Sequence, residues 1–119
     1  MSYDPLSEVI DEPLVISAQS MQQLTILRAS AKFDDLHGTD IAEEQLRLSQ
    51  FFNELLNRLL AEVCANPHKL WVMSQFQLIL EAVQMEDTEG RECFGTQLEK
   101  VMDILNSESS DGLLGFYLG

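Results

Sequence analysis

Residues 48–63, LSQFFNELLNRLLAEV, decide the fold class of this chain. An α-helix has about 3.6 residues per turn, so apolar residues three and four apart share one face. The large apolar residues of this stretch follow that spacing, and Leu56 and Leu60 widen the stripe that they form: Leu48, Phe52, Leu55, Leu59 and Val63. The pattern predicts a long amphipathic helix with one face on a core.

The charged residues around this stripe predict where the helix begins. Asp40 and Glu43 resemble a capping box in which Asp replaces the usual Ser or Thr. We therefore expect the helix to begin at Thr39 or Asp40, after a loop over Phe33–Gly38, and to end near Ala65. Two pairs of opposite charge four residues apart should stabilise the helix on its solvent-exposed face: Glu43 with Arg47, and Glu54 with Arg58.

The dipeptide Asn66-Pro67 predicts a break followed by a new helix. Asn66 can cap a helix, and Pro67 suits the first helical position because that position needs no N–H donor. The new helix is expected over about His68–Met85. It should lie centrally, because it is nearly uncharged between Lys69 and Glu81.

A fourth helix is expected over about Glu89–Leu105, capped by Asp87 or Thr88. Gly90 and Gly95 lie within it, although each glycine costs a helix about 1 kcal/mol relative to alanine. We interpret both as sites where another helix packs closely.

The C-terminal residues follow a Ser- and acid-rich loop over Asn106–Gly112. Residues 112–119, GLLGFYLG, are too apolar to extend into water. They are expected to fold back and dock on the core, as a short helix capped by Ser110 or Asp111.

The N-terminal residues are less regular. Met1–Pro13 contains four acids and two prolines without a helical period, which predicts an irregular acidic lead-in. Ser17 can cap a helix over Ala18–Lys32, and a short strand over Leu14–Ser17 is an alternative for the residues before it. We therefore predict an all-α fold, a small bundle of three to four amphipathic helices with a docked C-terminal segment, in a single helical domain over residues 14–119.

Charge narrows the classes of partner. The chain has 119 residues, with 7 Lys and Arg against 20 Asp and Glu, and a net charge of −13. Such a surface repels nucleic acid and anionic membranes and attracts basic proteins, so we expect a basic protein partner. Acidity that serves only solubility is the alternative. No secretory leader and no run of ~20 apolar residues is visible, which predicts a cytoplasmic protein that does not span a membrane.

Side chains that could carry chemistry are few. Cys64 and Cys93 are interpreted as buried free thiols on apolar helix faces, as in a reducing compartment. Cys64 and His68 are four residues apart, but Asn66-Pro67 breaks the helix that would align them on a metal. No phosphate-binding loop, nucleophile elbow or zinc-protease motif is present. We expect no catalytic residue, metal or cofactor.

The segment Met85–Glu92, MEDTEGRE, is the most distinctive in the chain. It can be a capped helix start in which Arg91 pairs with a nearby acid. It can also form a binding face if the fourth helix lies beside the C-terminal segment. The acids that would then form one partner-binding face are Asp87, Glu89, Glu92, Glu108 and Asp111.

Three stretches near the C-terminus resemble the signature of a small bacterial family without an assigned function: residues 87–92, DTEGRE; residues 98–105, LEKVMDIL; and residues 109–115, SSDGLLG. The resemblance implies a bacterial, single-domain, helical protein and assigns no functional residue. Gly90 and Gly115 depart from the signature. The matching positions are Asp87, Glu89, Arg91, Asp111 and Gly112.

Small size, acidity and the lack of a catalytic motif favour a protein-binding module over an enzyme. Our first hypothesis is an immunity or inhibitor protein for a bacterial toxin, whose acidic face would plug a basic cleft. The second is an acidic secretion chaperone or adaptor, and the third is a ligand-binding protein or enzyme with a site between helices. The oligomeric state stays open.

Overall fold

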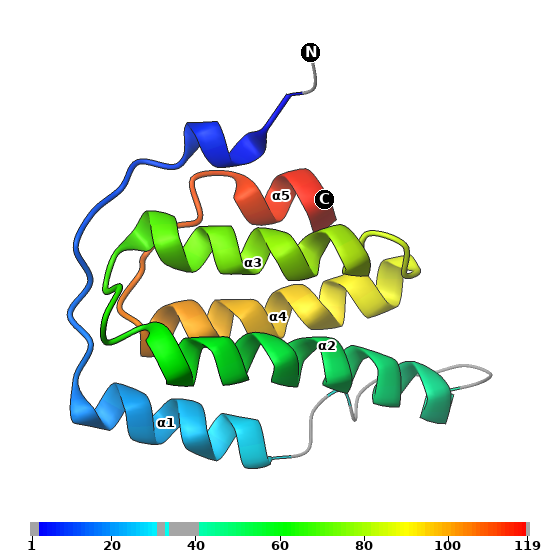
Figure 1. The fold of residues 1–119 in the computed structure, drawn as a ribbon. Coiled ribbons are helices and arrows are strands. Elements are labelled where there is room, and N and C mark those ends of the chain that lie inside the picture. The colour runs from blue at the N-terminus through cyan, green and yellow to red at the C-terminus, as the bar shows by residue number, and fades with distance from the viewer. Residues whose placement is uncertain (1–2, 31–32, 34–40, 119) are drawn as a thin grey trace.

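The computed structural model describes residues 3–30, 33 and 41–118, and these residues form helices without a strand (Figure 1). The predicted all-α fold is confirmed. A short 3₁₀ helix, η1, and five α-helices follow one another along the described residues: η1 Pro5–Glu8, α1 Ala18–Ala29, α2 Ile41–Glu62, α3 Lys69–Val83, α4 Thr88–Ile104 and α5 Leu113–Leu118. The residues between η1 and α1 run along one edge of the molecule, past the start of α3 (Figure 1).

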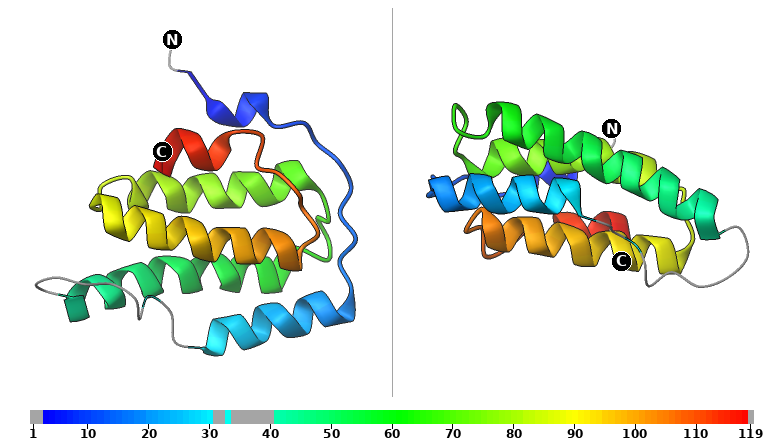
Figure 2. Two further views of the ribbon diagram at one scale, coloured as in Figure 1. Left: turned by 180° about the vertical axis from the view of Figure 1, so that it is seen from behind. Right: turned by 90° about the horizontal axis from the view of Figure 1, so that it is seen from below.

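The helices form a flat molecule of two layers, with principal extents of 42 × 40 × 19 Å. Helices α2 and α3 lie in the front layer and α4 lies behind them (Figure 2). Helix α1 packs against α2 and α4 at one edge, and α5 packs against α3 and α4 at the other. Helix α4 therefore has α1 on one side and α5 on the other, and its rear face is open to solvent.

The apolar stripe of α2 is buried as predicted. Its residues Leu48, Phe52, Leu55, Leu59 and Val63 are fully buried. The stripe faces α3 and α4, whose buried residues complete one core. Burial of a Leu or Phe side chain stabilises a fold by about 1.5–3 kcal/mol, so this stripe is a main source of stability.

Phe33 lies in the core, although the sequence pattern predicted a loop for its segment. Its side chain is only 3% exposed and stacks on Phe94, with ring centroids 5.8 Å apart. Both rings also lie against Phe52, at 6.1 and 5.6 Å. The rest of the predicted loop over Phe33–Gly38 and the predicted capping residue Asp40 lie outside the described residues.

One of the two predicted ion pairs on α2 is confirmed. Arg58 donates to Glu54 at 3.2 Å. Glu43 attracts Arg47 electrostatically, but the predicted ion pair between them does not form, because Arg47 donates instead to both carboxylate oxygens of Glu86, at 2.7 and 2.6 Å. A guanidinium and a carboxylate joined by two parallel hydrogen bonds pair more strongly than a single helix-face contact.

The predicted cap of α3 is also wrong. His68, not Asn66, occupies the capping position, and it makes no side-chain capping bond. Asn66 donates instead to the carbonyl of Glu62 at the end of α2. The first N–H groups of α3 are satisfied by the lead-in: Lys69 N donates to Glu12 O at 2.9 Å, and Leu70 N donates to Asp11 Oδ1 at 3.0 Å. A cap supplied from residues so distant in sequence leaves no local pattern.

The predictions for α4 and α5 hold more closely. Asp87 caps α4 by accepting from Gly90 N at 2.8 Å. The residues after Gly112 form a helix docked on α3 and α4, and Ser110 caps it by accepting from Leu114 N at 3.3 Å. Asp111 does not cap this helix.

Part of the lead-in is more regular than predicted. Residues Pro5–Glu8 form η1, and Asp4 caps it by accepting from Leu6 N at 3.0 Å. Pro5 is buried, and η1 contacts α3 and α5. Gln77 of α3 donates to the Asp4 carboxylate at 2.7 Å, which fixes this segment to the bundle.

Candidate functional site

The five acids proposed as one binding face lie at the two ends of α4. Asp87 is the capping residue, and Glu89 and Glu92 follow it in the first turns. Glu108 and Asp111 lie beyond the other end of the helix. A helix of 17 residues is about 25 Å long, so the five do not form one cluster.

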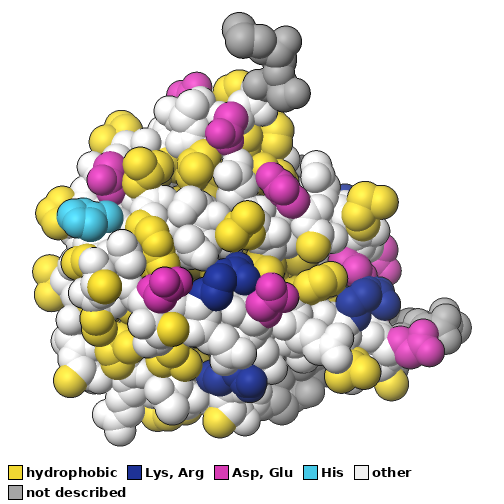
Figure 3. Space-filling view, viewed as in Figure 1, with side chains coloured by type: hydrophobic (Ala, Val, Ile, Leu, Met, Phe, Trp, Pro, Cys, Tyr) yellow, Lys and Arg dark blue, Asp and Glu magenta, His cyan; other side chains and the backbone are white. Residues whose placement is uncertain are grey.

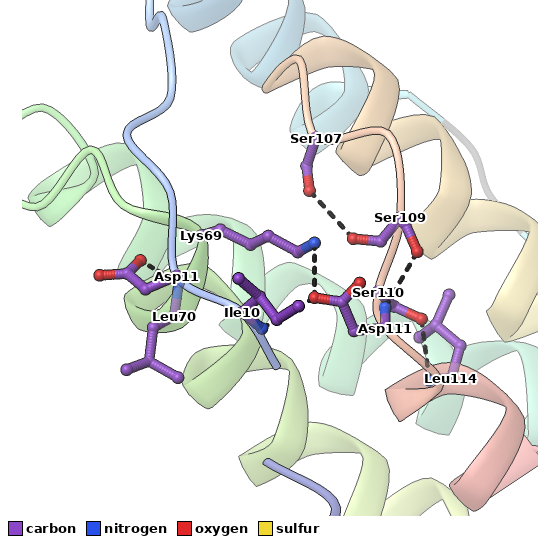
Figure 4. A network of polar contacts seen from close by, with 9 residues as sticks. All are labelled: Ile10, Asp11, Lys69, Leu70, Ser107, Ser109, Ser110, Asp111 and Leu114. Atoms are coloured by element: carbon purple, nitrogen blue, oxygen red, sulfur yellow. Dashed lines mark hydrogen bonds and ion pairs between the residues drawn. The ribbon is translucent and has the colours of Figure 1, made fainter. Parts of the chain in front are cut away.

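Asp111 is engaged in holding the fold together (Figure 4). Its Oδ2 accepts from Lys69 Nζ at 2.8 Å and from Ile10 N at 2.9 Å. The hydrogen bond from Lys69, followed by that from the Ile10 backbone, lowers the pKa of Asp111. Lys69 is only 4% exposed, so Asp111 neutralises a buried charge and joins the lead-in to the start of α3.

The Ser-rich loop before α5 is held mainly by its own hydrogen bonds. Ser107 is buried and donates to Ser109 O at 3.4 Å, and Ser109 Oγ accepts from Asp111 N at 3.0 Å (Figure 4). Asp111 adopts a left-handed backbone conformation with φ of 53°, which Asp tolerates better than most residues. The loop is therefore ordered and presents Glu108 at the end of α4.

Three exposed acids lie in one row along α4. Glu92, Glu99 and Asp103 are seven and four residues apart, so they lie on one face of the helix. All three are exposed, as is Glu108 beyond the end of the helix. Sequence reasoning missed Glu99 and Asp103, although their spacing from Glu92 was a usable signal. We call the four acids the acidic wall: Glu92, Glu99, Asp103 and Glu108.

Two hollows lie between the acidic wall and α5. One of about 340 Å³ is lined by Glu99, Asp103 and Glu108, with Leu114 of α5. The other, of about 370 Å³, is lined by Glu92 and Glu99, again with Leu114. Because Glu99 and Leu114 line both, the two hollows adjoin, and we call them together the α4–α5 trough.

The hollow lined by Leu114 and Leu118 is the more apolar part of the trough and contains two glycines, Gly95 and Gly115, whereas Gly90 lies outside the trough. A Cβ atom on Gly95 would lie 3.0 Å from Leu118 Cδ1, so this glycine allows α5 to pack closely on α4. A Cβ atom on Gly90 would lie 2.6 Å from Glu44 Oε1 of α2. The predicted close packing at Gly90 and Gly95 is thus confirmed. Gly115 differs, because a Cβ atom there would meet nothing within 4 Å.

The sequence comparison adds the family to this geometry. Residues 15–118 match the family described as a domain of unknown function, DUF4844. The chain belongs to the DUF4844 family. The match confirms that the chain falls in a family of unknown function, and it extends well beyond the C-terminal stretches on which the resemblance rested. No curated protein and no solved structure matches this chain.

The DUF4844 match contains the whole trough and all five α-helices but begins after η1. The lead-in that caps α3 and pairs with Asp111 thus lies almost entirely outside the matched residues. The family match thus covers the helices that form the trough together with the rest of the helical core.

A second group of charges lies where α2 meets the start of α4. Burial, and then the nearby carboxylate of Asp87, raise the pKa of Glu44. Glu44 Oε1 is buried, and the side chain of Glu44 interacts with that of Asp87. Arg91 donates to Thr88 Oγ1 at 3.5 Å rather than to the acid that we expected. No arrangement of a nucleophile and a base is formed by these groups.

The cysteines differ from the prediction that both are buried. Cys64 is exposed and Cys93 is half-buried. Cys64 lies beyond Glu62, the last residue of α2, so its side chain does not lie on the apolar face of that helix. Within residues 3–30, 33 and 41–118, no three His, Cys, Asp or Glu side chains are grouped to hold a metal ion. None of the helices in this part of the chain is long and apolar enough to span a membrane.

Proposed function

We propose that this protein is a cytoplasmic protein-binding module that recognises a basic partner, and that it acts as an immunity or inhibitor protein for a bacterial toxin. The observation that carries the proposal is the acidic wall beside an open trough. Its carboxylates are exposed, lie along one helix face and border a concave surface. A basic cleft or segment would gain both charge complementarity and buried area there.

The charge pattern of the opposite face supports this choice of surface. On the front of the molecule Lys and Arg side chains lie beside Asp and Glu (Figure 3). Two of the ion pairs within the described residues join Arg47 to Glu86 and Arg58 to Glu54. None of the ion pairs within the described residues involves the acidic wall. A partner's Lys or Arg can therefore pair with these carboxylates without first breaking an ion pair within the described residues.

The test is capture of a partner with matched charge variants. The tagged protein is incubated with lysate of the source cell and washed at low and then high salt. The site variant is E99K/D103K, and the control is E62K/E81K, which makes the same charge change at exposed positions of α2 and α3. We expect one basic protein that salt releases, that E62K/E81K retains and that E99K/D103K loses.

Inhibition is then measured directly. The captured protein is purified and its toxicity or enzymatic activity is assayed with increasing amounts of the acidic protein. Complete inhibition near an equal molar ratio supports the immunity role. Equal loss of capture by both double variants would mean that net charge alone drives association, and that outcome contradicts the assignment of the acidic wall.

A further inference from the structure

We propose that the α4–α5 trough receives a short basic segment of the partner, which inserts one large apolar side chain over Gly115 and pairs its Lys or Arg side chains with the acidic wall. This inference rests on the proposed function and specifies the chemistry of the segment that is bound. It follows from the shape of the trough floor and from the charge of its border.

The floor offers a place for one side chain. Apart from its two chain neighbours and the backbone of α5, no described atom lies within 4 Å of the position that a Cβ atom on Gly115 would occupy. Leu114 and Leu118, on either side of this glycine in sequence, line the same hollow of about 370 Å³ and are half-buried. An inserted aromatic or aliphatic side chain would cover these leucines, and burial of apolar surface contributes about 25 cal/mol per Å².

The acidic wall along the trough determines the charge of the residues that flank the inserted side chain in the bound segment. The trough is lined by the four carboxylates of the acidic wall and by a single basic residue, Arg91. Along the helix axis, Glu92 to Glu99 spans about 10 Å and Glu99 to Asp103 spans about 6 Å. Lys and Arg side chains on both sides of the inserted residue can reach carboxylates at these separations. An acidic segment would be repelled, and a purely polar basic segment would leave the leucines uncovered.

The test uses a synthetic peptide with one central tryptophan between several lysines, titrated into the protein by calorimetry. The site variant is G115W, which fills the trough with the protein's own side chain. Gly115 does not have a positive φ, so a side chain there causes no backbone strain. The control is A61W, at an exposed position on α2. Circular dichroism and the unfolding midpoint establish that both variants are folded.

We expect G115W to weaken peptide binding at least about tenfold, equivalent to about 1.4 kcal/mol, and A61W to change it less than about twofold. Replacing the central tryptophan of the peptide by glycine should weaken binding to the unmodified protein by a similar factor. Replacing its lysines by glutamates should abolish binding.

The inference is overturned if the tryptophan and glycine peptides bind equally, because binding would then need charge alone. It is also overturned if folded G115W binds the peptide as tightly as the unmodified protein. The two proposals fail separately. If G115W captures the basic partner from lysate unchanged while E99K/D103K loses it, the insertion over Gly115 is wrong and the acidic binding module stands.

Discussion

At the scale of the residue, Phe33 shows how one side chain can complete a core from within an irregular segment. Its φ of 67° places it in the left-handed region, which is unfavourable for a bulky residue. Gln45 of α2 donates to its carbonyl at 2.9 Å and holds the backbone in place. The Phe33 ring stacks on Phe94 and meets Phe52 edge to face, and these contacts offset the strain, since aromatic pairs contribute about 0.5–1.5 kcal/mol beyond the burial of their area.

We therefore expect F33A to lower the free energy of unfolding by about 3–4 kcal/mol, as for other buried phenylalanines. Urea denaturation followed by circular dichroism measures this change. Phe116 is 49% exposed, so F116A should cost less than about 1.5 kcal/mol and serves as the control. Equal losses in the two variants would mean that the Phe33 ring does not fill the core.

Glu44 makes stability depend on pH. Burial chiefly, assisted by the Asp87 carboxylate, raises its pKa above the usual 4.5. The folded state then binds the proton more tightly than the unfolded state does, so the contribution of Glu44 to stability is greatest below pH 4.5 and is lost as pH rises through the raised pKa. Above that range the ionised Glu44 carboxylate destabilises the folded state.

E44Q should accordingly stabilise the protein at pH 7 and lose this advantage as pH approaches 4.5. Unfolding midpoints measured across this range test the prediction. The control is E43Q, because Glu43 is exposed and its substitution should change the free energy of unfolding by less than about 0.5 kcal/mol. A destabilised E44Q at pH 7 would show that the ionised carboxylate stabilises this part of the fold.

At the scale of the element, the helices that the sequence predicted well are those whose signals are local. The periodicity of α2 and the Asp87 cap of α4 each depend on residues within a few positions, so pattern and structure agree. The start of α3 and the burial of Phe33 depend on contacts with distant parts of the chain. The trough was missed for the same reason, because the side that α5 presents to α4 cannot be read from either helix alone.

The cap of α3 gives a sharp test of this distinction. Asp11 supplies its side chain to Leu70 N, whereas Glu12 supplies only its backbone carbonyl to Lys69 N. D11A should lower the free energy of unfolding by about 1 kcal/mol, the usual value of a side-chain cap. E12A keeps its carbonyl and should cost less than about 0.5 kcal/mol. Both are measured by urea denaturation, and equal effects would rule out side-chain capping by Asp11.

At the scale of the whole molecule, 20 acidic and 7 basic residues share a flat molecule whose thinnest extent is 19 Å. Repulsion among like charges destabilises a compact state, and salt screens it over about 10 Å at 0.1 M. We expect sodium chloride at about 0.3 M to raise stability at pH 7 on the order of 1 kcal/mol, or roughly 4 °C in melting temperature. Near the isoelectric point of about 4.2 the same salt should have little effect. A melting temperature that falls with salt at pH 7 would mean that attractive pairs outweigh the repulsion.

The bond between Ile10 and Asp111 also has a consequence for how the chain is made. It joins residues 101 positions apart, and the lead-in lies on α3 and α5, the latter at the far end of the chain. During translation the first residues therefore leave the ribosome long before the surface that receives them exists. Until α5 emerges, Lys69 lacks its carboxylate partner and the apolar surface beneath α5 is uncovered. A nascent chain stalled before residue 111 should thus be open to proteolysis and to chaperones, and this fold forms only after α5 has been made.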